Sequence, residues 1–151
     1  MDSKAIADAI AARFTGVTVS VGGVTEGIAV GPTASLPNSI GRGPALLVYP
    51  PSGVLEIGVS KLRSDELDYM VRLLRDPLNV PARSDALHAW YTALRDRVEM
   101  QMSLGLAYVS WARATSARVA IDGEEYADGI YDVVELGIRV HFNEIVTTVQ
   151  P

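Results

Sequence analysis

The sequence contains no cysteine, and this absence excludes two kinds of stabilisation. Disulfide bridges and thiolate metal sites both need cysteine sulfur, so neither contributes to this fold. Apolar runs are also short, because none approaches the length of about 20 residues that a membrane helix requires. The opening stretch MDSKAIADAIAARF has an early aspartate and no continuous apolar segment, unlike a signal peptide. We therefore expect a soluble protein that is not secreted.

Basic residues and histidines are scarce as well. The chain has 13 Lys and Arg against 18 Asp and Glu, which gives a formal net charge of −5. Unspecific capture of nucleic acid needs clustered Lys and Arg, and no such cluster stands out. The two histidines, His88 and His141, are far apart in sequence and match no ligand motif. We predict neither a metal site nor a cofactor.

Known catalytic and nucleotide-binding motifs are absent as well. The stretch GRGPAL begins like a glycine-rich dinucleotide loop, but a proline follows directly and the third glycine is missing. The sequence has no GxxxxGK[ST] loop, no GxSxG elbow and no HExxH motif. The residues therefore predict no enzyme.

The pattern of apolar residues predicts helices and strands. With 151 residues, of which 48% are hydrophobic and 21% charged, the chain has the size of one globular domain, residues 1–151. A first helix is expected over residues 3–14, with Ser3 as its cap, Ile6 and Ile10 one turn apart, and Gly16 at its end. A longer helix is expected over residues 85–104, capped by Ser84 and ended by Gly105.

Strands are expected over six other parts of the chain. Alternating valines predict a strand at 17–21, and ALLVY at 45–49 reads as a strand with both faces covered. Segments 54–62 and 66–74 predict a hairpin with RSD as its turn. Residues 107–121 predict one or two strands, with a helix over the first half as the alternative, and 134–142 alternate as a strand. The fold class is therefore α+β, with a mainly antiparallel sheet.

Two segments carry the functional hypotheses. Residues 26–43 are rich in Gly, Pro, Ser and Asn, and a stretch of this length without regular pattern is typical of a functional loop, either a lid or an arm. Residues 122–135 are acidic and contain no basic residue. That segment is open to three interpretations: a solvated turn, a weak site for a hard cation, or a surface that repels nucleic acid.

The order of these features resembles a known family. The features are the N-terminal SKAIADAIAARF, the proline-bracketed GPALLVYPPSG, the hairpin LEIGVSKLRSDELDYMVRLL, the helix SDALHAWYTALRDRVEM and the closing YDVVELGIRVHFNEIV. Together they resemble the tail terminator family of long-tailed bacteriophages. The resemblance implies an α+β protein that forms a hexameric ring on the last ring of the tail tube. Such a ring stops tube growth and presents a surface to head-completion proteins, in a virion assembled in the host cytoplasm.

The resemblance assigns no catalytic residue, but it gives the two segments roles. We expect the arm at 26–43 to lie against a neighbouring subunit and to bury Ile40 and Arg42 there. Charged hairpin residues that set the register with a neighbour or the tube are Glu56, Lys61 and Arg63. Residues expected to face the pore, through which DNA passes without specific binding, are Asp122, Glu124, Glu125 and Asp128.

Two alternatives remain open. In the first alternative, the chain is another head–tail connector ring component. This would be either a head-closure protein, a class that is more purely β, or an adaptor, a class that is more purely helical. Otherwise it is a small-ligand-binding or enzyme domain that uses the Gly/Pro segment as a lid.

Overall fold

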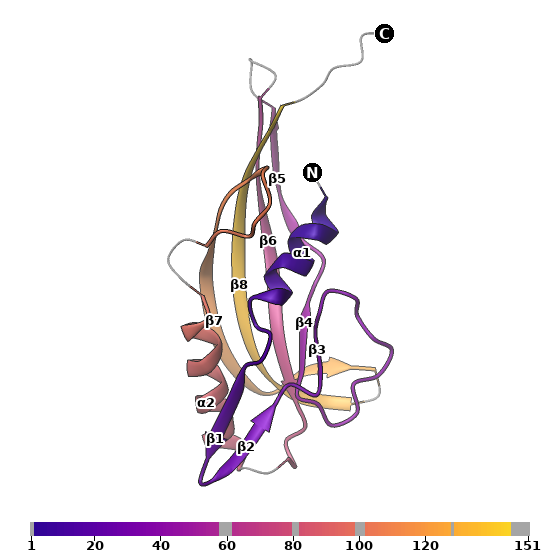
Figure 1. Ribbon diagram of the computed structural model, residues 1–151. Helices are drawn as coiled ribbons and strands as arrows, with labels where there is room; N and C mark the ends of the chain where they lie inside the picture. The colour runs from indigo at the N-terminus through magenta and orange to yellow at the C-terminus, as the bar shows by residue number, and fades with distance from the viewer. Residues whose placement is uncertain (1, 58–61, 80–81, 99–101, 128, 146–151) are drawn as a thin grey trace.

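The computed structural model in Figure 1 describes residues 2–57, 62–79, 82–98, 102–127 and 129–145. For residues 53–57, 62–65 and 143–145 the backbone alone is described. The two helices of this part of the chain are α1 (Ser3–Ala12) and α2 (Arg83–Asp96). Its strands are β1 (Thr18–Val21), β2 (Val24–Gly27), β3 (Val30–Thr33), β4 (Ala45–Val48), β5 (Ser52–Ile57), β6 (Leu62–Arg75), β7 (Val109–Tyr126) and β8 (Gly129–Ile145). The α+β prediction is confirmed.

The strands form one hairpin and one larger sheet. β1 and β2 pair with each other, and the other strands follow the order β3-β4-β6-β8-β7, with β5 paired to another part of β6. β3 and β4 are parallel, and every other described pair is antiparallel. The long strands β6 and β8 pair from Leu62↔Ile145 to Arg75↔Asp132 and form the spine of the sheet.

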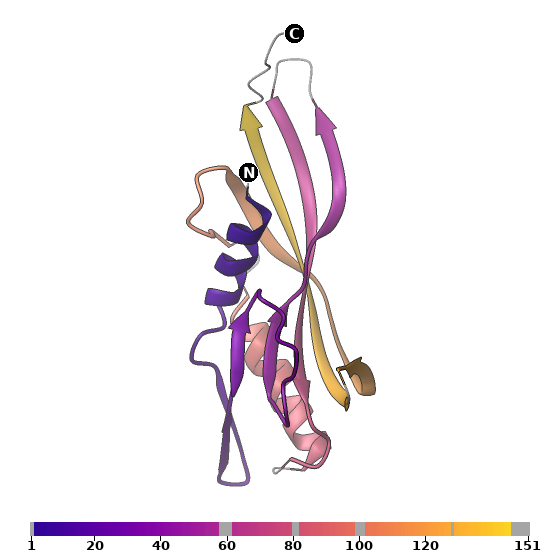
Figure 2. The same cartoon turned by 90° about the vertical axis from the view of Figure 1, so that its right-hand side faces the viewer.

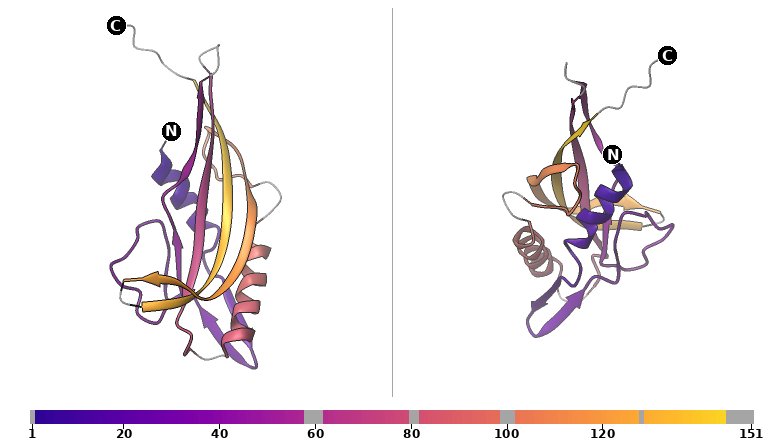
Figure 3. Two further views of the ribbon diagram at one scale, coloured as in Figure 1. Left: turned by 180° about the vertical axis from the view of Figure 1, so that it is seen from behind. Right: turned by 45° about the horizontal axis from the view of Figure 1, so that its top comes forward.

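The sheet is covered on one face. Figures 1 and 2 show α1, α2 and the β1–β2 hairpin on the same side of it. Seen from behind in Figure 3 (left), the other face is uncovered along most of its length, and the end of the β7–β8 hairpin bends across its lower part. Successive side chains of β6 and β8 point to opposite faces of the sheet. The residues that face the helices therefore differ in polarity from those on the uncovered face.

The helix-covered face holds the main core, and the bend encloses a second one. The main core joins Ile6 and Ile10 of α1 and Trp90 of α2 to the inward residues of the sheet. The second core consists of Ile40, Ala45, Leu47, Leu74, Tyr131 and Val133. β4 contributes to both cores, and all four of its residues are buried, so its prediction as a strand covered on both faces is confirmed.

The caps of both helices differ from the prediction. At α1, Asp2 Oδ1 accepts hydrogen bonds from the backbone N–H of Lys4 at 3.0 Å and of Ala5 at 3.1 Å, so Asp2 and not Ser3 is the cap. At α2 the cap position is Ala82, which makes no side-chain bond, so the prediction of Ser84 was wrong. The Asp2 carboxylate, one residue before Ser3, accepts hydrogen bonds from the free backbone N–H groups of the first turn, as a serine cap would.

The long helix predicted over 85–104 is not confirmed, because α2 ends at Asp96. Met102 pairs with Ala112 of β7 instead: Met102 N–H donates to Ala112 O at 2.7 Å, and Ala112 N–H donates to Met102 O at 3.1 Å. The Met102 side chain is also buried in the main core. Strand pairing with Ala112, ten positions further along the chain, thus overrides the helical spacing of the sequence.

Two predicted turns are strands in the structure. Residues 63–65, expected as the RSD turn, pair with β5 as Ile57↔Arg63, Glu56↔Ser64 and Leu55↔Asp65. The acidic stretch from residue 122 to 126 belongs to β7, which has a register shift between Ala120 and Glu124. The irregular segment expected over 26–43 is also shorter, because β2 and β3 occupy residues up to 27 and 30–33.

Candidate functional site

The uncovered face of the sheet carries two groups of paired side chains. We call it the open face; its described residues include Asp68, Arg72, Trp111, Arg113, Arg118, Glu124, Glu135, Arg139 and His141. These positions alternate along the strands with residues of the main core such as Tyr69 and Leu136. The open face is visible from behind in Figure 3 (left).

Glu135 is at the centre of the first group. Arg72 Nε donates to its Oε2 at 2.7 Å, and Arg118 Nε donates to its Oε1 at 3.0 Å. Arg72 also lies 3.7 Å from Glu124 Oε1 and packs over the Tyr49 ring at 4.6 Å. Burial raises the pKa of Glu135, but hydrogen bonds from both arginines outweigh it, so that the pKa lies below its ordinary value. The carboxylate is therefore held charged between two cations.

The second group lies further along the same strands. Arg139 Nε donates to Asp68 Oδ1 at 2.8 Å. The rings of Trp111 and His141 stack with centroids 5.2 Å apart, and the Arg113 guanidinium lies 4.7 Å from the Trp111 ring centroid. Each interaction joins neighbouring strands or alternate residues of one strand. The open face is therefore an ordered polar surface on which Arg72, Arg118 and Arg139 are matched by carboxylates.

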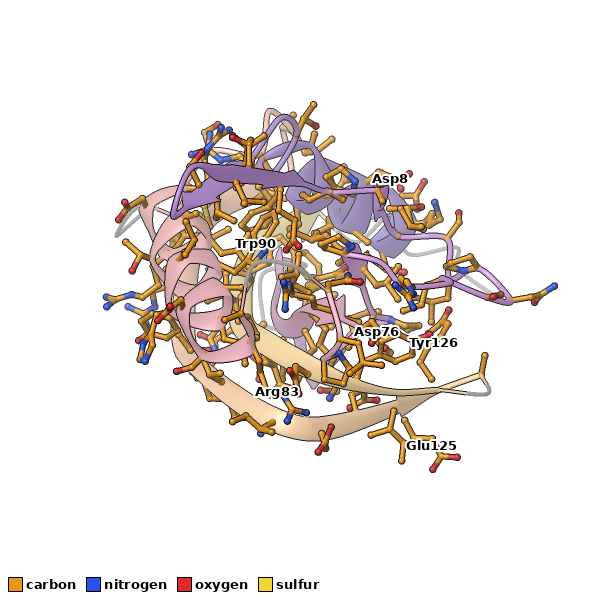
Figure 4. The ribbon with its side chains drawn as sticks, turned by 90° about the horizontal axis from the view of Figure 1, so that it is seen from below. Asp8, Asp76, Arg83, Trp90, Glu125 and Tyr126 are labelled. Carbon is orange, nitrogen blue, oxygen red and sulfur yellow. The ribbon has the colours of Figure 1, made fainter. Side chains whose placement is uncertain are left out.

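Within the segment 26–43 that was predicted as an arm, residues 34–43 follow β3 and lie against the chain's own β7–β8 hairpin; from here on, the arm means residues 34–43. The Tyr126 hydroxyl donates to Pro37 O, and the Tyr131 hydroxyl donates to Gly41 O at 2.7 Å. Figure 4, seen from below, shows Tyr126 turned toward the inside of the molecule. Gly43 has φ +64°, and a Cβ there would lie 2.6 Å from Leu74 O, so glycine alone lets the arm approach β6 this closely.

The structure separates the two residues predicted to bury on a neighbour. Ile40 keeps only 4% of its surface exposed, because it belongs to the chain's own second core. The Arg42 side chain is exposed, while its carbonyl accepts from Asp76 N–H at 3.1 Å and from Asn79 Nδ2 at 2.9 Å. Arg42 is thus available to a partner, whereas Ile40 is already packed.

The other predicted interface residues are described only in part. Glu56 and Arg63 lie in paired strands, with their backbone alone described. Lys61 lies outside the described residues.

The residues predicted to face a pore do not form one cluster. Arg83 Nη2 donates to Asp122 Oδ1 at 2.6 Å, and Glu124 is directed to Arg72 on the open face. Glu125 points away from the hairpin in Figure 4. Asp128 lies outside the described residues. Strand alternation accounts for the different directions of the neighbours Glu124 and Glu125.

Two buried ionic contacts were missed by the sequence analysis. Glu26 Oε1 accepts from Arg75 Nε at 2.8 Å and from Trp90 Nε1 at 2.6 Å, where Arg75 is fully buried. Asp132, also fully buried, accepts from Arg83 Nε at 2.8 Å and from the Asp122 N–H at 2.8 Å. Glu26 is 49 positions from Arg75 and 64 positions from Trp90, so no local sequence pattern predicts this contact.

The described part of the chain has several hollows at its surface, with volumes from about 220 to about 510 Å³. A groove of about 510 Å³ between β1 and α2 is lined in part by Thr18, Ser20, His88 and Asp96. Within the described ranges, no group of three or more His, Asp or Glu side chains is placed to hold a metal ion. In the same ranges, no helix has both the length and the apolar character needed to cross a membrane.

Neither the family models nor the curated proteins compared with this sequence give a match. Function is therefore argued from the geometry of this chain.

Proposed function

We propose that this protein is a structural subunit of a phage virion, which forms a hexameric ring at the head-proximal end of the tail tube. The ring ends tube growth and joins the tail to the head connector. The observation that carries the proposal is the one-sided sheet, packed by both helices on one face and bearing paired charges on the other. Such a sheet suits a wall with a packed exterior and a solvated interior.

The chemistry of the open face fits a lumen through which DNA moves. Phosphates are held by clustered cations, and each cation bound releases counterions. On the open face Arg72 and Arg118 are paired with Glu135, and Arg139 with Asp68. These arginines are therefore already compensated, and passing DNA gains little by contacting them.

The arm supports contact with a neighbouring subunit through its outer side. Leu36 is 40% exposed and Arg42 is exposed, whereas the inner side of the arm is held by the two tyrosine hydroxyls. The arm is therefore a shaped surface that keeps its conformation in the single chain. This presentation lowers the ordering entropy lost when a partner binds.

Electron microscopy of tail tubes assembled with and without this protein tests the proposal. We expect tubes of uniform length that end in an added ring when the protein is present, and longer, variable tubes when it is absent. An unchanged length distribution with no added ring would contradict the proposal. Binding only to tubes that already carry a terminal ring would instead indicate a head-closure or adaptor role.

A further inference from the structure

The outer edge of β7 is unpaired along its middle. On one side β7 pairs with β8, and on the other side Ala112 pairs with Met102. From residue 114 to 120 the described residues supply no strand on that outer side. Thr115, Ser116 and Arg118 are exposed there, beside a groove of about 310 Å³ between β7 and α2. An unpaired edge of this kind is a template for a further strand.

The opposite edge is also unpaired. β5 pairs with β6 alone among the described strands. Reading across the register, Ser52 lies beside Asp68, Asp68 beside Arg139, and Arg139 beside Arg113. At this level the sheet is therefore β5-β6-β8-β7, and the described strands supply no partner for its two outer edges.

We propose that β5 of one copy of this chain pairs with β7 of the next copy around the ring, an inference that rests on the proposed function. The strands of β5-β6-β8-β7 alternate in direction, so β5 and β7 run oppositely. Rotation about an axis along the strands keeps these directions, so the new pair is antiparallel. Charge does not oppose the pairing, because the only charged residue of β5 is the acid Glu56 and the only charged residue of 114–120 is the base Arg118, so no like charges face each other.

The tilt of strands in a closed sheet fixes the register of the pair. Strands of closed sheets tilt by about 40° and coil in a right-handed sense. Four strands are about 19 Å wide, so this tilt offsets neighbouring copies by about 16 Å, or about five residues. With the helices outside, as oriented in Figure 1, the neighbour's β5 is lowered toward the β7–β8 bend. Ser52 then lies opposite Arg118 and not opposite Arg113.

This register fits the open stretch of β7. β5 would run upward from Arg118 and end below Ala112, the position that Met102 already occupies. Ser52 is beside Asp68 and Arg118 is beside Glu135, and both of these partners lie on the open face. The pairing therefore joins the open faces of successive copies into one continuous lining.

Cross-linking of single-cysteine variants tests the pairing, because the natural chain has no cysteine. Ser52→Cys and Ser116→Cys proteins, distinguished by a mass tag, are mixed and treated with a thiol cross-linker that spans about 8 Å, the diagonal distance across a strand pair. We expect the mixed dimer to exceed both same-variant dimers at least fivefold. Ser52→Cys mixed with Ser20→Cys, an exposed serine on β1, is the matched control.

Sedimentation velocity on the same samples separates this inference from the proposed function. If rings form but the mixed dimer of Ser52→Cys and Ser116→Cys does not exceed the control, the β5–β7 pairing is overturned while the ring proposal stands. Monomers without that excess would also overturn the pairing, and the tube-length experiment would still decide the function independently.

Discussion

At the scale of single residues, the Glu26 contact holds the β1–β2 hairpin to the rest of the molecule. One carboxylate on β2 accepts from Arg75 at the end of β6 and from Trp90 on α2. The side chains of the ion pair are 0% and 9% exposed, for Arg75 and Glu26 respectively. Removing one member of a buried pair leaves the other charge uncompensated, which costs more than the pair itself contributes.

We expect Glu26→Ala to lower the free energy of unfolding by about 3 kcal/mol, because Arg75 keeps its buried charge. Urea denaturation measures the loss. Glu125→Ala, at an exposed glutamate of β7, is the control and should change the free energy by less than about 0.5 kcal/mol. Equal losses in the two variants would show that the Glu26 contact contributes nothing specific.

Glu135 gives the molecule an acid-sensitive contact. Its pKa in the folded state is below the ordinary value of 4.5, because hydrogen bonds from Arg118 and Arg72 outweigh the effect of burial. A carboxylate with a lowered pKa stabilises the fold above its unfolded-state pKa, and this stabilisation is lost as the pH falls through the folded-state pKa.

We therefore expect Glu135→Gln to be less stable than the natural chain at pH 7, with a difference that shrinks as the pH falls below about 4.5. Urea unfolding at a series of pH values between about 7 and 3 measures both proteins. Glu125→Gln should differ from the natural chain by a small amount that changes little over this range. A Glu135→Gln difference that is constant with pH would contradict the ion-pair account.

At the scale of elements, the arm and the β7–β8 hairpin stabilise each other. Two tyrosines of the hairpin donate to carbonyls of the arm, and Ile40 of the arm fills the core under the bend. The arm adds no strand of its own to the sheet, so its position depends on these few contacts. Local opening of such a segment costs less than unfolding of the whole chain.

Tyr131→Phe should release the arm without unfolding the sheet. The change removes the bond to Gly41 O and should cost about 1 kcal/mol. Hydrogen exchange followed by mass spectrometry should show faster exchange in residues 35–43 and unchanged exchange in β6 and β8. Tyr91→Phe on α2, remote from the arm, is the control. Uniformly faster exchange would mean that the hydroxyl stabilises the whole fold and not the arm.

At the scale of the whole molecule, three of the four arginines described on the open face are matched by carboxylates. The net charge of −5 opposes DNA binding, and Arg72, Arg118 and Arg139 of the open face are paired with Asp68, Glu124 or Glu135. Phosphate binding to these arginines would have to break those pairs. A protein that DNA must pass freely benefits from this arrangement.

We expect the natural chain to bind a labelled DNA duplex with a dissociation constant weaker than about 100 µM at 200 mM salt, measured by fluorescence anisotropy. The double variant Asp68→Asn/Glu135→Gln leaves Arg139, Arg72 and Arg118 without these carboxylates and should bind more tightly, with a steeper dependence on salt. Low-micromolar binding by the natural chain would contradict the account of the open face.

The sequence by itself determined the elements whose apolar period is regular. Alternation predicted strands over 66–74 and 134–142, where β6 and β8 lie, and isoleucines one turn apart predicted the helix α1, because a strand or helix on a core must repeat its apolar residues with its own period. Regular apolar spacing gave a wrong prediction where another contact competes, as at the end of the helix predicted over 85–104. Met102 continues the spacing of α2, yet its backbone pairs with Ala112.

Only the tertiary structure decided which side chains meet. Whether Ile40 faces a neighbour or its own core depends on the bend of β7 and β8, which lies some 90 positions along the chain from the arm, as in the Tyr131–Gly41 contact. The Glu26–Arg75–Trp90 contact and the pairing of Glu124 with Arg72 likewise join segments far apart in sequence. The apolar period and the composition of a segment indicate which of its sides is buried and which is in water. Contacts between segments far apart in sequence follow instead from strand order and register.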